Sequence, residues 1–204
     1  TLSSGRKSHC YADWRIVNDV YTLLELADFI IAFADDHKLN PDTFYGVPAS
    51  ATKIALVTQL QHTQTCSGYR RGSHVLAMGR EKPKDYGNPL HRNFIGIPRG
   101  RTIVLENAVT TGNSLMGTID LLRKNEVHVV AAVSLTDRME KRDDGSTVEE
   151  ATTRLNVPYY SMSNLYDLLP LACRRSKPSE LVIRSIEQEF QQYGVKPLLT
   201  LRSI

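Results

Sequence analysis

The sequence predicts an open α/β fold, in which a mostly parallel sheet carries helices on both faces. Short apolar stretches bounded by turn residues alternate along the chain with longer segments whose apolar residues recur every three or four positions. This alternation is typical of parallel sheets whose strands are joined by helical crossovers. The 204 residues are 41% hydrophobic and 23% charged, as in an ordinary globular domain. We therefore expect one domain over residues 1–204.

The first half of the chain is expected to hold two helices and two strands. Leu23, Ala27 and Ile30 belong to an apolar stripe at helical spacing, and Pro41 follows the end of that stripe. The expected elements are a helix over residues 19–38, a strand over 43–47, a helix over 52–62 and a strand over 74–78.

The second half repeats this order after a polar segment without apolar periodicity, residues 79–93. The expected elements are strands over residues 102–105, 127–135 and 157–160 and helices over 114–124, 148–155, 164–172 and 179–193. Ligands of parallel sheets bind beyond the carboxyl ends of the strands. We therefore expect the site in the loops that follow Val47, Met78, Leu105 and Leu135.

The composition excludes several classes of protein. Cys10, Cys66 and Cys173 are odd in number and widely spaced, which fits neither a disulfide framework nor a zinc site and predicts a reducing, cytoplasmic location. The net charge of +3 is slight, and no helix-turn-helix or basic aromatic stripe appears, so no nucleic-acid partner is expected. Apolar runs are too short for a membrane span. The first residues show no signal pattern. Because the sequence starts with Thr1 and not with an initiator methionine, we expect it to begin inside a longer chain.

The loop after Leu105 carries the strongest functional signal. An apolar strand runs into Glu106 and Asn107, which are placed to hold ribose hydroxyls, and a short turn then opens a helix. Backbone N–H groups of such a turn, aided by the helix dipole and the hydroxyl groups, form a nest for a phosphate. The residues expected to hold the phosphate are Thr110, Thr111, Gly112, Asn113 and Ser114.

Residues 103–115 resemble the phosphoribosyl pyrophosphate (PRPP) motif of type I phosphoribosyltransferases. Three further segments narrow the resemblance to the orotate phosphoribosyltransferase family. Residues 4–13 are similar to its SGxxSxxYxD segment beside the orotate ring, residues 80–87 resemble its mobile catalytic loop, and residues 134–138 resemble the strand end whose arginine meets the orotate carboxylate. With Gly46-Val47-Pro48 at the pyrophosphate loop, these segments follow the family's order.

The resemblance implies a type I phosphoribosyltransferase fold with a small N-terminal base-binding hood over residues 1–18 and a mobile loop over 79–93. It implies transfer of ribose 5-phosphate from PRPP to orotate, giving orotidine 5′-monophosphate and pyrophosphate. Mg²⁺ would be bound mainly through PRPP, with no protein ligand assigned to it. A homodimer that shares the mobile loop across its interface is also implied.

The same resemblance assigns the candidate site residues. Positive charge develops on the ribose while pyrophosphate leaves as a polyanion, so cations must balance the leaving group. The expected catalytic residues are Arg80, Lys82, Lys84, Tyr86, Glu106 and Asn107. The small residues expected at pyrophosphate are Ala49, Ser50 and Ala51, and those expected at orotate are Tyr11, Thr110 and Arg138.

Departures from the family pattern leave alternatives open. The second acid after the strand is replaced by Asn107, and Glu81 follows Arg80 where many relatives carry lysine. A carboxamide hydrogen-bonds a ribose hydroxyl but brings no negative charge to the developing cation. A second hypothesis is therefore a weakly active or inactive regulatory paralogue that binds PRPP or a nucleotide. A third keeps the enzyme but gives it another pyrimidine or a purine as the base.

Overall fold

A four-stranded parallel sheet forms the centre of the computed structural model, which describes residues 2, 4–87, 91–198 and 201. In spatial order the strands are β1 (Thr43–Gly46), β4 (Arg101–Val109), β5 (His128–Asp137) and β6 (Tyr159–Ser161). Gly46 pairs with Leu105, and Val109 pairs with Asp137, so β4 and β5 end together and β1 ends four residues before them at the same edge of the sheet. The predicted parallel α/β sheet is confirmed.

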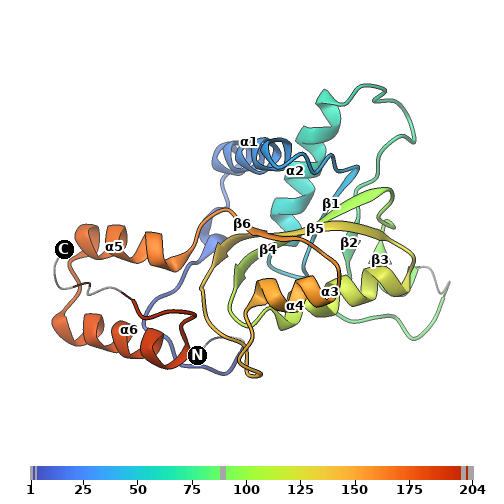
Figure 1. Ribbon diagram of the computed structural model, residues 1–204. Coiled ribbons are helices and arrows are strands. Elements are labelled where there is room, and N and C mark those ends of the chain that lie inside the picture. The colour runs from blue at the N-terminus through green and yellow to red at the C-terminus, as the bar shows by residue number, and fades with distance from the viewer. Residues whose placement is uncertain (1, 3, 88–90, 199–200, 202–204) are drawn as a thin grey trace.

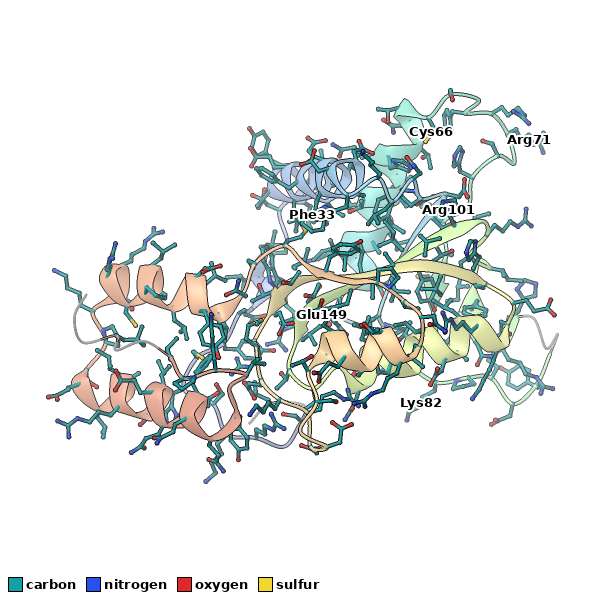
Figure 2. The ribbon with its side chains drawn as sticks, in the orientation of Figure 1. Phe33, Cys66, Arg71, Lys82, Arg101 and Glu149 are labelled. Carbon is teal, nitrogen blue, oxygen red and sulfur yellow. The ribbon has the colours of Figure 1, made fainter. Side chains whose placement is uncertain are left out.

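Helices cover both faces of this sheet (Figure 1). Those on one face are α1 (Val20–Asp36) and α2 (Thr52–Thr65), and those on the other are α3 (Asn113–Lys124) and α4 (Val148–Arg154). In Figure 2, Phe33 of α1 and Glu149 of α4 mark the two sides. Side chains alternate along β4: Ile103 packs in the core beneath α1 and α2, and Val104 packs in the core beneath α3.

Helices α5 (Leu165–Ser176) and α6 (Glu180–Tyr193) stand together beyond the β6 side of the sheet (Figure 1). They enclose a third core that contains Leu169 and Phe190. The sequence left open whether the apolar C-terminal tail packs on the domain or on a partner. Leu201 is buried in this third core and Leu198 packs against it, whereas Leu199 lies outside the described residues. The described part of the tail therefore packs on its own chain.

The prediction of a strand over residues 74–78 is wrong. The structure instead has β2 (Met78–Gly79) and β3 (Phe94–Ile95), which form a separate antiparallel pair. A strand inside a parallel sheet needs apolar side chains on both faces, but Leu76 is 47% exposed in this short apolar run. The segment therefore borders the sheet without joining it.

Strand β4 extends four residues beyond its expected end at Leu105. Ala108 pairs with Thr136 and Val109 with Asp137, so the longer neighbour β5 continues the ladder. Glu106 and Asn107 consequently lie on the strand itself, in positions fixed by the sheet.

The N-terminal segment crosses from α6 to the carboxyl edge of the sheet before α1 begins (Figure 1). It contains a short 3-10 helix, η1 (Trp14–Ile16). The Trp14 Nε1 donates to Thr136 Oγ1 of β5 at 3.0 Å, which fixes the segment to the strand end. No helix in the described ranges is long and apolar enough to cross a bilayer.

Candidate functional site

The candidate site consists of two adjoining hollows at the carboxyl ends of the strands, which we name after the ligands expected there. Of the four loops expected at the site, those after Val47 and Leu105 line these hollows, and those after Met78 and Leu135 do not. The phosphate hollow is lined by Ser4, Glu106 and residues 108–114. The base hollow, of about 280 Å³, is lined by residues 11–15, Pro48, Ser50, residues 106–108 and Ser114. Glu106, Ala108 and Ser114 line both, so the two hollows form one continuous site.

The phosphate hollow is built around the first turn of α3. Gly112, the N-cap residue, has a left-handed backbone with φ of 70° and provides no side-chain cap. A Cβ on this residue would lie 2.8 Å from Met116 Cε and 3.2 Å from Val148 Cγ1, so glycine is needed here for both conformation and space. The first N–H groups of a helix have no acceptor within it. The start of α3 is therefore open to an anion.

The loop between β5 and α4 contacts this turn through Arg142. Arg142 Nη1 donates to the carbonyl oxygen of Thr111, while Arg142 Nε is buried without a hydrogen-bond partner in the described part of the chain. Thr111 is itself buried. Arg142 thus holds the phosphate turn in place and brings a positive charge close to it.

The proposed pyrophosphate loop precedes helix α2 in a similar way. Ala51 is the N-cap of α2 and makes no side-chain cap. A Cβ on Gly46 would overlap the backbone at Ala51, so the loop turns back tightly over the end of β1. Ser50 lines the base hollow and Ala49 is exposed beside it, whereas Ala51 is buried. The peptide bond between Pro48 and Ala49 is cis.

Glu106 and Asn107 lie between these two helix starts. Burial raises the pKa of Glu106 to about 7, and the N–H of Asn107 donates to Glu106 Oε1 at 3.0 Å. The Oδ1 atom of Asn107 is buried and accepts no hydrogen bond from any described residue. A buried acceptor is costly unless it is paired, so this oxygen is available to a hydroxyl group or a hard cation.

The base hollow is walled by the N-terminal segment. Tyr11 lines it and is 59% exposed, and its expected contact with the base stays a prediction. Arg15 Nε donates to Asp13 Oδ1 at 2.7 Å, and its guanidinium lies 5.2 Å from the centre of the Tyr11 ring. Thr110 lines the phosphate hollow and is absent from the base hollow, so it lies on the phosphate side of the site.

Arg138 is not brought to either hollow. Its side chain is 2% exposed and forms ion pairs of 2.7 Å with both Glu140 and Glu189. It also donates to the carbonyl oxygen of Cys10 at 3.0 Å and to Ser8 Oγ at 2.8 Å. Its expected contact with the base stays a prediction, but the free protein commits this guanidinium to internal partners.

The candidate loop cations also lie outside the hollows. Arg80 Nε donates to the carbonyl oxygen of His91 at 3.3 Å, and Lys84 Nζ lies 5.3 Å from the centre of the Tyr86 ring. Lys82 projects from this loop on the α3 side of the molecule (Figure 2). Of the predicted mobile segment 79–93, residues 88–90 lie outside the described residues.

Three lining or supporting residues were missed from the sequence. Ser4 lines the phosphate hollow although its segment was expected beside the base. Arg15 lines the base hollow, and its position two residues after Asp13 was the available signal. Arg142 stands in a charged loop, where its contact with Thr111 could not be read from any pattern.

The described residues contain no group of three or more His, Cys, Asp or Glu side chains suited to hold a metal ion. The oxygen atoms of Glu106 and Asn107 are hard ligands, and they suit a Mg²⁺ ion that arrives with a phosphate-bearing substrate.

Comparisons with known proteins agree with the fold. No family model matches the chain. The orotate phosphoribosyltransferase of Actinobacillus pleuropneumoniae serotype 5b is 24% identical over 203 residues, covering 96% of this chain and 89% of that protein. The solved orotate phosphoribosyltransferase of Aeropyrum pernix superposes with a TM-score of 0.59 at 26% identity, over 82% of this chain and 86% of that one. The Mycobacterium tuberculosis H37Rv orotate phosphoribosyltransferase in complex with PRPP gives a TM-score of 0.54 at 20% identity, over 82% of this chain and 88% of that one.

The parallel sheet with helices on both faces and these relatives together define a type I phosphoribosyltransferase fold. Within that class, the relatives that match over most of the chain are orotate phosphoribosyltransferases.

Proposed function

We propose that the protein is an orotate phosphoribosyltransferase of pyrimidine nucleotide biosynthesis. It would transfer ribose 5-phosphate from PRPP to a ring nitrogen of orotate and release pyrophosphate. The observation that carries the proposal is that two hollows share Glu106, one at the uncapped start of α3 and the other lined by Pro48 and Ser50 before α2. PRPP has the matching form, because its ribose separates a phosphate from a pyrophosphate.

The chemistry assigns Glu106 to the sugar. When the bond from ribose C1 to pyrophosphate breaks, positive charge develops on the ring, and an ionised Glu106 stabilises it electrostatically. The buried Oδ1 atom of Asn107 would accept a hydrogen bond from a ribose hydroxyl. Mg²⁺ bound to PRPP supplies charge balance for the leaving pyrophosphate. Orotate needs no strong base, since its ring nitrogen is flanked by carbonyl groups, and catalysis depends on positioning.

The loop cations enter the proposal through a second subunit. Arg80, Lys82 and Lys84 do not line the site of their own chain. A homodimer in which this loop closes over the neighbour's site would bring them to pyrophosphate and exclude water. Light scattering with PRPP and Mg²⁺ tests this part of the proposal, and a monomer would contradict it.

The activity test compares the native chain with Asn107→Asp. Both proteins are given PRPP, Mg²⁺ and orotate, and loss of orotate absorbance is followed. We expect native turnover and a rise in rate of up to about 100-fold in the variant, because an added charge about 5 Å from the cationic sugar is worth roughly 3 kcal/mol. Absence of turnover by both proteins, with PRPP bound, would overturn the proposal.

A regulatory PRPP-binding module is the second candidate, and Asn107 is the observation that favours it. This candidate predicts that the native chain binds PRPP without turnover and that Asn107→Asp restores activity. Calorimetric titration with PRPP, run beside the absorbance assay, separates the two functions.

A further inference from the structure

A buried hydroxyl group without a partner lies just outside the two hollows. Tyr45, on β1, is completely buried, and its hydroxyl oxygen has no hydrogen-bond partner among the described residues. Burial raises the pKa of this phenol, so the group keeps its proton and is a donor. A buried tyrosine hydroxyl usually finds a partner, and leaving it unpaired costs free energy. A second arrangement that supplies an acceptor is therefore favoured.

Tyr159, on β6 at the opposite edge of the sheet, shows the ordinary arrangement. Its hydroxyl group lies 2.8 Å from Ser134 Oγ and donates to Asp137 Oδ2, also at 2.8 Å. The unpaired hydroxyl of Tyr45 is thus a property of its own surroundings.

These surroundings are the β2–β3 pair and the loop that follows β1. Figure 1 shows β2 and β3 beside β1, and β1 contacts β2. The Tyr45 ring packs edge-on against Phe94 of β3, with 6.1 Å between the ring centres. A Cβ on Gly79 of β2 would overlap both the Tyr45 hydroxyl oxygen and Pro48 Cγ. The hydroxyl group therefore lies directly against the Gly79 backbone.

The carbonyl group of Gly79 is a suitable acceptor. Gly79 is opposite Phe94, and the N–H of the next residue, Arg80, donates to the carbonyl oxygen of Asn93 at 2.9 Å. In an antiparallel ladder, a pair with hydrogen bonds at the neighbouring positions makes none of its own, so β3 does not use the Gly79 carbonyl. A small shift of β2 would bring this oxygen within hydrogen-bond distance of the Tyr45 hydroxyl.

Both sides of this contact lead to residues assigned to pyrophosphate. Gly79 directly precedes Arg80, the first candidate cation, and Tyr45 lies four residues before Ala49, the first residue of the pyrophosphate loop. Pro48 lies against Gly79 and also lines the base hollow. When pyrophosphate occupies the sites of the proposed dimer, both segments of each chain are held by ligand, and this sets the position of β2 against β1.

We propose that Tyr45 is a positioning residue, whose hydroxyl group donates to the Gly79 carbonyl when pyrophosphate is bound. The contact sets the position of the segment that carries Arg80, Lys82 and Lys84. This inference rests on the proposed function, since it takes the pyrophosphate of PRPP as the ligand.

The test compares Tyr45→Phe with the matched control Tyr159→Phe, because each variant removes one hydroxyl oxygen. Urea denaturation of the free proteins comes first. Tyr45→Phe is expected to be at least as stable as the native chain, because its hydroxyl has no partner to lose. Tyr159→Phe should unfold at lower urea, because it loses the contacts with Ser134 and Asp137.

Ligand binding measures the positioning role. Magnesium pyrophosphate and ribose 5-phosphate are titrated calorimetrically into each protein. Tyr45→Phe should weaken pyrophosphate binding by about 5- to 10-fold, the usual effect of losing one hydrogen bond, and leave ribose 5-phosphate binding unchanged. Tyr159→Phe should change neither affinity.

Limited digestion with trypsin reports the position of the segment itself. Trypsin cleaves after Arg80 and Lys84, and saturating magnesium pyrophosphate should slow both cleavages in the native chain. In Tyr45→Phe, saturating ligand should protect these two bonds less than in the native chain and in Tyr159→Phe.

Two results would overturn the inference while leaving the proposed function intact. One is a loss of stability in free Tyr45→Phe equal to that in Tyr159→Phe, which would show that the hydroxyl is already paired. The other is native pyrophosphate affinity and native tryptic protection in Tyr45→Phe. A native chain that neither binds pyrophosphate nor turns over orotate would contradict the proposed function, and this inference with it.

Discussion

The phosphate side and the base side of the site differ in how their polar groups are paired within the protein. At the phosphate side, helix α3 starts without a side-chain cap and Asn107 Oδ1 is buried without a partner among the described residues. At the base side, Arg138 has four hydrogen-bond acceptors from the protein itself, in Ser8, Cys10, Glu140 and Glu189.

This difference indicates that the phosphate side is suited to bind a ligand and that the cluster around Arg138 supports the structure. Open donors and acceptors on a rigid strand and helix start are prepared for a ligand, because nothing in the protein competes for them. Saturated groups hold segments together and contribute to the shape of the site. Helices α4, α5 and α6, which lie away from the hollows, are capped by Thr147, Asn164 and Ser179, as expected of helices without a ligand.

Breaking the support should have the largest effect on stability. Arg138→Met leaves Glu140 and Glu189 buried with a missing partner, and we expect the free energy of unfolding to fall by about 3–5 kcal/mol. Urea denaturation measures it. Arg184→Met, which breaks an exposed pair with Glu180, should cost less than about 1 kcal/mol. Equal losses of unfolding free energy in the two variants would show that the buried cluster of Arg138, Glu140 and Glu189 does not stabilise the fold more than an exposed ion pair.

Glu106, on the phosphate side, should make the stability of the protein depend on pH. The pKa of Glu106 is raised to about 7 from 4.5, so the folded state holds a proton that the unfolded state has already lost between these values. Its contribution to stability is complete below pH 4.5 and disappears as the pH rises through 7, a loss of about 3 kcal/mol. Glu106→Gln should remove this pH dependence and unfold at higher urea than the native chain at pH 8.

The matched control for Glu106 is Glu149→Gln on the exposed side of α4, which should leave the pH dependence unchanged. A native chain with the same slope as Glu106→Gln between pH 4.5 and 8 would contradict a raised pKa for Glu106.

The smallest of these effects concerns the turn itself. Gly112→Ala places a methyl group against Met116 and Val148 in a left-handed backbone, so we expect a loss of about 1–3 kcal/mol in PRPP binding or stability. Gly145 has a similar φ of 81°, but nothing lies within 4 Å of a Cβ there. Gly145→Ala should therefore cost stability alone and leave PRPP affinity, measured by calorimetry, as it was.

The phosphate side could be predicted from the sequence because it is local. An apolar strand, an acid, a short turn and a helix follow one another between residues 103 and 115, and their order alone places Glu106 beside the turn. The same holds for the small residues before α2. What this reasoning missed was the length of β4, since Ala108 and Val109 join the strand only because β5 is long enough to pair with them.

The base side could not be predicted in this way. Arg138 meets Cys10 across 128 positions of the chain and Glu189 across 51. No periodicity connects these residues. The amphipathic pattern of α6 predicts a helix but does not show which part of the protein the helix packs against. The sequence alone is consistent with a surface position for Arg15. The structure shows that this residue lines the base hollow.

The uncapped starts of α2 and α3 have a consequence for the protein without substrate. A Ser, Thr, Asp or Asn cap contributes about 1 kcal/mol relative to alanine, as at Ala51, and only a few tenths of a kcal/mol relative to glycine, as at Gly112. The free chain is less stable by about these amounts than it would be with capped helices. A bound phosphate or pyrophosphate supplies the missing acceptors, and ligand at 100 times its dissociation constant adds about 2.7 kcal/mol to the folded state. Under the proposed function, the substrate would complete the fold, and the amount of folded protein in a cell would follow the supply of PRPP.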